Sequence, residues 1–152
     1  MTSSFRRHFA EHQRVVQDSL SLESAVDAAG EAIVSALLNG KKVLTFGNGG
    51  SAAEASHLAE ELVGRFRKTR RAFPAISLSS DSGTVTCISN DFGYEALFER
   101  QIEAFAQTGD VAVALTTSGK SENVLRGLRA ARAKGATTIA LTGEAGLVPT
   151  AD

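Results

Sequence analysis

The sequence predicts an α/β protein with three layers, α/β/α, around a doubly wound parallel sheet. Three observations support this fold class. Short apolar segments alternate with helical patterns from residue 42 to residue 141. The segment 111–115 is apolar throughout, which is typical of a parallel strand covered by helices on both faces. A strand, a polar turn and a helix also follow one another twice, around residues 43–63 and 111–134, as in β–α units.

The elements can be assigned in order along the chain. Two amphipathic helices come first, at 5–20 and 22–39, and Asn39-Gly40 ends the second one. The four predicted strands are 42–46, 74–78, 111–115 and 137–141. The predicted helices that follow the strands are 51–63, 81–89, 94–106 and 121–134. We expect one domain over residues 1–152, with the helical segment 1–40 packing on the sheet or on a neighbouring subunit.

The end of the chain is unusual for this fold class. Residues 143–152 have the composition of a loop that leads into a further strand. Two interpretations stay open: either the sheet is small, or a C-terminal strand and a closing helix are missing from this chain.

Composition excludes several classes of protein. The 16 Lys and Arg residues nearly balance 17 Asp and Glu residues, which gives no sign of nucleic-acid binding. The sequence has no apolar run long enough for a membrane span, and its polar start lacks the core of a signal peptide, so we expect a cytoplasmic protein. The single cysteine, Cys87, excludes an internal disulfide, and we expect it to be a small buried residue.

The first polar turn, Gly47 to Ala52, has the spacing GxGxxA of a dinucleotide-binding loop. The acidic residue that such a loop needs about 20 positions later is replaced by the basic segment 65–68, so a dinucleotide site is disfavoured. Glycines still let backbone N–H groups approach an anion or sugar hydroxyls. The simpler alternative is a tight turn in which Ser51 caps the next helix.

The second polar turn, Thr116 to Ser121, ends in Gly-Lys-Ser like a P-loop. The opening glycine of that motif would fall at Ala114, inside the strand, so the turn is not a P-loop. Four hydroxyl groups and a glycine at a helix start suit a sugar phosphate. Helix capping alone is the alternative, but it needs only one hydroxyl.

The helix after the first turn carries His57 and Glu61, four residues apart and therefore on one face. The pair could bind a divalent metal, or Glu61 could act as a general base. The alternatives are a core histidine and a solvated glutamate. Glu60 points about a third of a turn away and is the expected surface residue. Asp91 either caps the following helix or reaches a substrate hydroxyl.

Several linked motifs together resemble the phosphoheptose isomerases of the sugar isomerase (SIS) domain superfamily. These motifs are Phe46 to Ser51, Ala59 to Phe66, Phe73 to Ile76, Asn90 to Gly93 and Thr116 to Ser121. The resemblance implies isomerisation of sedoheptulose 7-phosphate to D-glycero-D-manno-heptose 7-phosphate through an enediol, for heptose biosynthesis. It also implies a homotetramer with sites at subunit interfaces, and a zinc ion in each subunit.

The same resemblance implies roles for residues of this sequence. Glu61 would be the catalytic base, and His57 and Glu61 would be the metal ligands. The residues implied to contact the substrate or its phosphate are Asn48, Gly49, Gly50, Ser51, Glu61, Asn90, Asp91, Thr116, Thr117, Ser118 and Ser121.

One departure from the family pattern weakens the assignment of activity. Family members continue beyond the position of Asp152 into a strand and a helix that carry a glutamine and a histidine of the site. If the chain is complete, we expect little or no turnover. The alternative is a non-catalytic SIS module that binds phosphosugars or proteins, such as the partner of a replication initiator. Such relatives typically lose the catalytic glutamate, so the presence of Glu61 favours an enzyme. A purely structural domain ranks last.

Overall fold

The computed structural model describes residues 3–143 and 146–147. Residue contacts divide the chain into two compact units, 1–32 and 33–152. The loop predicted over residues 143–152 falls largely on residues outside the described part. No helix of the described residues is long and apolar enough to cross a membrane. The cytoplasmic location stays a prediction.

The N-terminal part forms helices, as predicted. They are α1 (Ser4–Asp18), the 3₁₀ helix η1 (Ser19–Leu22) and α2 (Glu23–Leu38). The Ser3 hydroxyl caps α1 by accepting from the N–H of Arg6. No residue of α1 is buried, and the Phe5 and Phe9 rings stack with their centroids 5.9 Å apart. The apolar stripe that predicted α1 therefore lies on the surface of the chain.

Four parallel strands form the sheet, which confirms the predicted fold class. They are β1 (Val43–Gly47), β2 (Ala75–Ser77), β3 (Val111–Thr116) and β4 (Thr137–Thr142), in the order β2-β1-β3-β4. The chain moves outward from β1 to β2 and then returns to the other side of β1 for β3. The direction of winding therefore reverses between β1 and β3, where ligands of open α/β sheets bind beyond the carboxyl ends of the strands.

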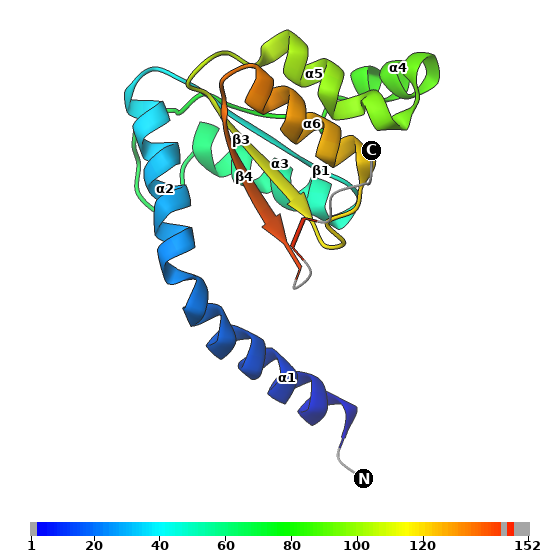
Figure 1. Cartoon of the computed structure of the whole chain (residues 1–152). Helices are drawn as coiled ribbons and strands as arrows, with labels where there is room; N and C mark the ends of the chain where they lie inside the picture. The colour runs from blue at the N-terminus through cyan, green and yellow to red at the C-terminus, as the bar shows by residue number, and fades with distance from the viewer. Residues whose placement is uncertain (1–2, 144–145, 148–152) are drawn as a thin grey trace. The chain divides into compact units, whose positions relative to one another are not determined.

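Helices cover both faces of this sheet. They are α3 (Gly50–Val63), α4 (Ser82–Phe92), the 3₁₀ helix η2 (Tyr94–Ala96), α5 (Leu97–Phe105) and α6 (Glu122–Ala133). Figure 1 shows α5 and α6 on one face of the sheet and α3 on the other. The core on the first face includes Phe46 and Phe98, whose centroids lie 5.0 Å apart. The second core joins Leu37, Val43 and Val111, with Leu58 of α3 packed against it.

The amino-terminal ends of β1 and β3 are tied by a buried ion pair. Lys42 Nζ lies 2.6 Å from Asp110 Oδ2, and the Lys42 N–H donates to Asp110 Oδ1 at 3.0 Å. Burial by itself raises the pKa of Asp110, but the hydrogen bonds from Lys42 and from the N–H of Gln107 outweigh it and lower this pKa. At the edge of the sheet opposite the polar turns, this ion pair therefore holds β1 and β3 together.

One sequence prediction about the core is wrong. Cys87 is exposed rather than buried, because it lies on an outer face of α4. Its thiol lies 3.7 Å from Asp91 Oδ2, one helical turn further on. A small apolar residue type therefore did not indicate burial on this short helix, whose buried residue is Ile88.

Candidate functional site

The first polar turn brings backbone N–H groups to the carboxyl end of β1. Gly49 is the N-cap of α3, with φ 57° and ψ −122°, and no side chain caps the helix. The prediction that Ser51 caps this helix is wrong, because α3 already begins at Gly50. A Cβ on Gly47 would lie 2.7 Å from the Leu115 carbonyl oxygen, so this position requires glycine to let the turn approach β3.

The second polar turn joins β3 to α6. Thr116 is buried and its hydroxyl accepts from the N–H of Gly119, while the Ser118 hydroxyl accepts from the N–H of Lys120, both at 3.3 Å. Ser121 is the N-cap residue of α6 but makes no side-chain cap bond. Among the described residues, the Thr117 and Ser121 hydroxyls have no hydrogen-bond partner. Capping therefore does not account for these two groups.

The structure brings the two turns together around an open cavity of about 460 Å³. The first turn contributes Gly50 and Ser51, the second contributes Thr116 and Thr117, and β4 contributes its last residues. This is the place between β1 and β3 where the fold class predicts a ligand. The remaining lining residues are Glu54, Leu115, Leu141, Thr142 and Gly143.

His57 and Glu61 lie together beside an adjoining cavity of about 480 Å³. His57 Nε2 is 3.3 Å from Glu61 Oε1, and the two side chains are 64% and 34% exposed. Both cavities are lined by Glu54, Leu115 and Leu141, so they meet along α3. The glutamate is thus half-buried next to the space between the turns, whereas Glu60 is exposed, as predicted.

Two ligands of the right type for zinc are present, but a complete site is not. Imidazole nitrogen and carboxylate oxygen both suit zinc, which takes at least three protein ligands in its known catalytic sites. Within residues 3–143 and 146–147, no group of three or more His, Cys, Asp and Glu side chains could hold a metal ion. The pair His57 and Glu61 therefore fits zinc in chemistry but not in number.

Asn90 and Asp91 lie in the last turn of α4, exposed, and line neither of the two cavities. Asn90 Nδ2 donates to Asp91 Oδ1 at 2.7 Å. The suggestion that Asp91 caps the following helix is wrong, because Asp91 is itself helical and Gly93 precedes η2. Their assignment to the substrate stays a prediction. Gly49, Ser118 and Ser121 lie in the two turns without lining either cavity.

Three residues that sequence reasoning did not select support the site. Asn48 bonds to Asn123 of α6 and to Tyr94 of η2. Arg70 donates to the backbone carbonyls of Glu61, Leu62 at 2.8 Å and Gly64 at 3.2 Å, which holds the end of α3. No local pattern marks these residues, because their partners lie on other elements or on the backbone.

The family model of the SIS domain matches residues 5–143. A phosphoheptose isomerase of Aquifex aeolicus is 58% identical over 127 residues, which cover 84% of this chain and 66% of that protein. One from Nitratiruptor is 46% identical over 147 residues, covering 96% of this chain and 79% of that protein. The solved phosphoheptose isomerase GmhA of Neisseria gonorrhoeae matches with a TM-score of 0.88 and 38% identity, over 93% of this chain and 74% of that one.

Proposed function

Because the chain belongs to the SIS-domain family and, within it, to the phosphoheptose isomerases, which are sugar-phosphate isomerases, we propose that it interconverts sedoheptulose 7-phosphate and D-glycero-D-manno-heptose 7-phosphate. One observation carries the proposal from this family to these residues. The half-buried carboxylate of Glu61 borders a cavity that adjoins the space between two turns suited to a sugar phosphate. A base and a phosphate site at one sheet edge are what the reaction requires.

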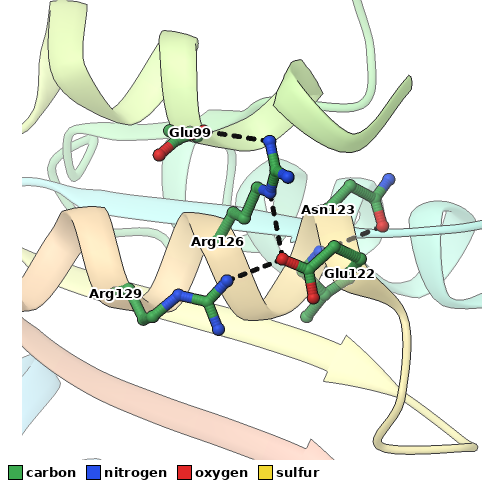
Figure 2. A network of polar contacts seen from close by, with 6 residues as sticks. Glu99, Glu122, Asn123, Arg126 and Arg129 are labelled. Carbon is green, nitrogen blue, oxygen red and sulfur yellow. Dashed lines mark hydrogen bonds and ion pairs between the residues drawn. The ribbon is translucent and has the colours of Figure 1, made fainter. Parts of the chain in front are cut away.

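The second turn is the proposed phosphate site. The Thr117 and Ser121 hydroxyls and the first N–H groups of α6 are donors that suit phosphate oxygens. Glu122 in the first turn of α6 would repel an anion, but its Oε1 lies 3.0 Å from Arg126 Nε and 2.7 Å from an Arg129 nitrogen. Figure 2 shows both arginines turned toward this carboxylate. They offset its charge and so favour an anion nearby.

Glu61 is the proposed base. It accepts a proton from C1 of the ketose, which leaves an enediol, and it returns a proton to C2 while the hydroxyl proton on O1 moves to O2. No net oxidation occurs, because one carbonyl is lost as the other forms. His57 lies on the same face of α3 and holds one carboxylate oxygen, so the other oxygen remains available for the carbon acid.

Zinc is a second part of the proposal. His57 and Glu61 would supply two ligands, and the others would come from outside the described residues or from a neighbouring subunit. A bound zinc ion would polarise a substrate oxygen. Metal content measured by mass spectrometry should approach one zinc per chain and fall in the His57→Ala variant. Equal zinc content in the two proteins would contradict this assignment.

A homotetramer is the third part. The exposed apolar residues of the N-terminal helices support it, because stripes of this kind usually pack against another surface. They include Phe5, Phe9, Val15, Val16 and Leu20. Light scattering should give four times the chain mass for the natural protein. A Phe5→Glu, Phe9→Glu double variant should give a smaller particle, and an unchanged mass would argue against this interface.

Isomerisation in D₂O tests the reaction and its chemistry together. We expect proton NMR to show heptose 7-phosphate formed from sedoheptulose 7-phosphate with solvent deuterium at C2, because an enediol exchanges its proton with solvent through the base. Product without deuterium would support a direct hydride shift instead. Binding of the sugar phosphate without turnover by the natural polypeptide would favour the non-catalytic SIS module.

A further inference from the structure

The side-chain amide of Asn48 is held by residues from two other elements. Asn48 and Asn123 exchange two hydrogen bonds, each 2.9 Å long, from the Nδ2 of one residue to the Oδ1 of the other. The Tyr94 hydroxyl lies 2.9 Å from the same Oδ1 of Asn48. The first polar turn is thereby joined to the start of α6 and to η2. Local sequence patterns could not predict this cluster, because its residues are 75 and 46 positions apart in the sequence.

The orientation of both amides is fixed by one backbone group. The N–H of Val124 can only donate, and it lies 2.9 Å from Asn123 Oδ1, a bond that it shares with the Ser121 carbonyl at 3.0 Å. Figure 2 shows Asn123 at the start of α6, with a dashed line from its oxygen to a backbone nitrogen. The Asn123 oxygen must therefore face the backbone, and its Nδ2 must face Asn48.

The orientation of the Asn123 amide also fixes the orientation of the Asn48 amide. Its Oδ1 accepts from Asn123 and from Tyr94, which uses both lone pairs. One of its two N–H groups donates to Asn123, and the other has no acceptor among the residues that the structure describes. In a reciprocal amide pair, the second N–H points away from the partner. Asn48 is half-buried and does not line the cavity between the turns itself, but it lies two residues before Gly50, which does.

We propose that Asn123 and Tyr94 are positioning residues that hold Asn48 as a hydrogen-bond donor to an acceptor oxygen of the sugar phosphate. The inference rests on the proposed function and deepens it, because it assigns which partner donates and which accepts in one hydrogen bond between the site and the substrate. An amide that was free to turn would offer a substrate either an oxygen or an N–H. The held amide offers only the N–H, so it favours a carbonyl or phosphate oxygen and disfavours a group that must donate.

A simple cross-link between the turn and α6 is the competing explanation. The reciprocal pair with Asn123, which is 3% exposed, would suffice for that purpose. The Tyr94 side chain is 49% exposed, and its hydroxyl adds a third bond to an oxygen that is already paired. An exposed hydrogen bond of this kind adds little to a cross-link that the buried pair already makes. Its effect is to occupy the remaining lone pair of Asn48 Oδ1. Variants separate the two explanations: loss of a positioning residue should raise KM through Asn48, whereas loss of a cross-link should lower stability.

The experiment compares Tyr94→Phe and Asn123→Asp in two backgrounds, with Asn48 intact and with Asn48→Ala. Tyr94→Phe removes only the hydroxyl. Asn123→Asp keeps the acceptor for Val124, removes the donor to Asn48 and adds a negative charge. With Asn48 intact, we expect KM for sedoheptulose 7-phosphate to rise about tenfold in Asn123→Asp and about threefold in Tyr94→Phe, with kcat within about twofold. Asn39→Asp, an exposed change of equal charge just after the end of α2, is the control and should leave KM unchanged.

The Asn48→Ala background decides the question. If the two residues act through Asn48, Tyr94→Phe should have no further effect on KM there, and Asn123→Asp should keep only the effect of its added charge. Equal fold-changes in both backgrounds, or a lower Tm with an unchanged KM, would overturn the inference while leaving the isomerase proposal intact. If Asn123→Asp does not fold, the Tyr94→Phe pair alone gives the same decision. A natural protein with no turnover would overturn the proposed function, and the inference with it.

Discussion

The two β–α units at the centre of the sheet, β1 with α3 and β3 with α6, look alike in sequence but differ in what they expose. Both place a polar turn at the carboxyl end of a buried strand, and neither helix has a side-chain cap. The first turn is built from glycine, and its helix presents His57 and Glu61 beside a cavity. The second turn is built from hydroxyl residues. One unit therefore suits proton transfer and the other suits anchoring of an anion.

Packing explains this difference. In α3 the buried residues are Ala55 and Ala59, so most of the helix surface stays open to the cavities. In α6 the buried face is much broader, and a Cβ on Gly127 would lie 2.9 Å from Phe98 Cβ. A closely packed helix holds its N-terminus and its turn in one position. A helix with a narrow buried stripe leaves its outer face available for reactive side chains.

The largest expected effect tests the role of α3. Glu61→Gln removes the proposed base while keeping the size of the side chain, so we expect kcat to fall by about 10²- to 10⁴-fold. Steady-state turnover of sedoheptulose 7-phosphate measures it. Glu60→Gln is the matched control, since this neighbour makes the same change of charge on an exposed face. A similar loss in both variants would mean that α3 does not carry the base.

The next effect tests whether the two units are joined at the opposite edge of the sheet. Asp110→Ala leaves Lys42 without its carboxylate and removes the acceptor for two backbone N–H groups. We expect the free energy of unfolding in urea to fall by about 3 kcal/mol, because breaking a buried pair costs more than the pair contributes. KM should not change, since this edge lies away from the turns. A raised KM would show coupling between the two edges.

The same ion pair predicts how stability depends on pH. The pKa of Asp110 is lower in the folded protein than in the unfolded chain, so its contribution is full above about pH 4 and is lost as the pH falls through the folded pKa. The difference in unfolding free energy between the wild type and Asp110→Ala should therefore shrink as the pH falls from about pH 4 to about pH 2. A difference that stays constant over this range would rule out this source of stability.

A smaller effect tests the close approach of the first turn to β3. Gly47→Ala would place a methyl group 2.7 Å from the Leu115 carbonyl and 2.9 Å from Ser51 Cβ. We expect a loss of about 1–3 kcal/mol in unfolding free energy, because the backbone must shift. Gly30→Ala is the control: a Cβ there meets nothing within 4 Å, and the change should be neutral or stabilising. Equal effects at the two sites would contradict the packing argument.

The smallest effect tests the second turn as the anchor. Thr117→Val and Ser121→Ala each remove one hydroxyl that has no partner among the described residues. We expect each to raise KM for the sugar phosphate by roughly threefold to tenfold with little change in kcat, which is the size of one hydrogen bond. Thr137→Val, on an exposed part of β4, is the control. If only kcat changed, the second turn would not be the site that binds the phosphate.

The sequence alone predicted the class of fold and the position of every described strand and α-helix to within a few residues, but not the 3₁₀ helices η1 and η2. Apolar runs and helical periodicity are local signals, and a parallel sheet follows from their alternation. The two turns and the pair His57 and Glu61 were visible for the same reason, since their residues are neighbours along the chain or on one helix face. The errors at Cys87, Ser51 and Asp91 are also local in origin: residue type suggested burial or capping, but helix boundaries and packing decided otherwise.

The tertiary structure alone decided how these parts meet. It placed the two turns around one cavity, joined that cavity to the face of α3, and fixed the Asn48 amide through Asn123 and Tyr94. Hydrogen bonds between residues far apart in sequence depend on the register of strands and on the packing of helices. Local sequence patterns carry no record of that geometry. They therefore indicated which chemical groups this protein has, and only the folded sheet determined which of them act together.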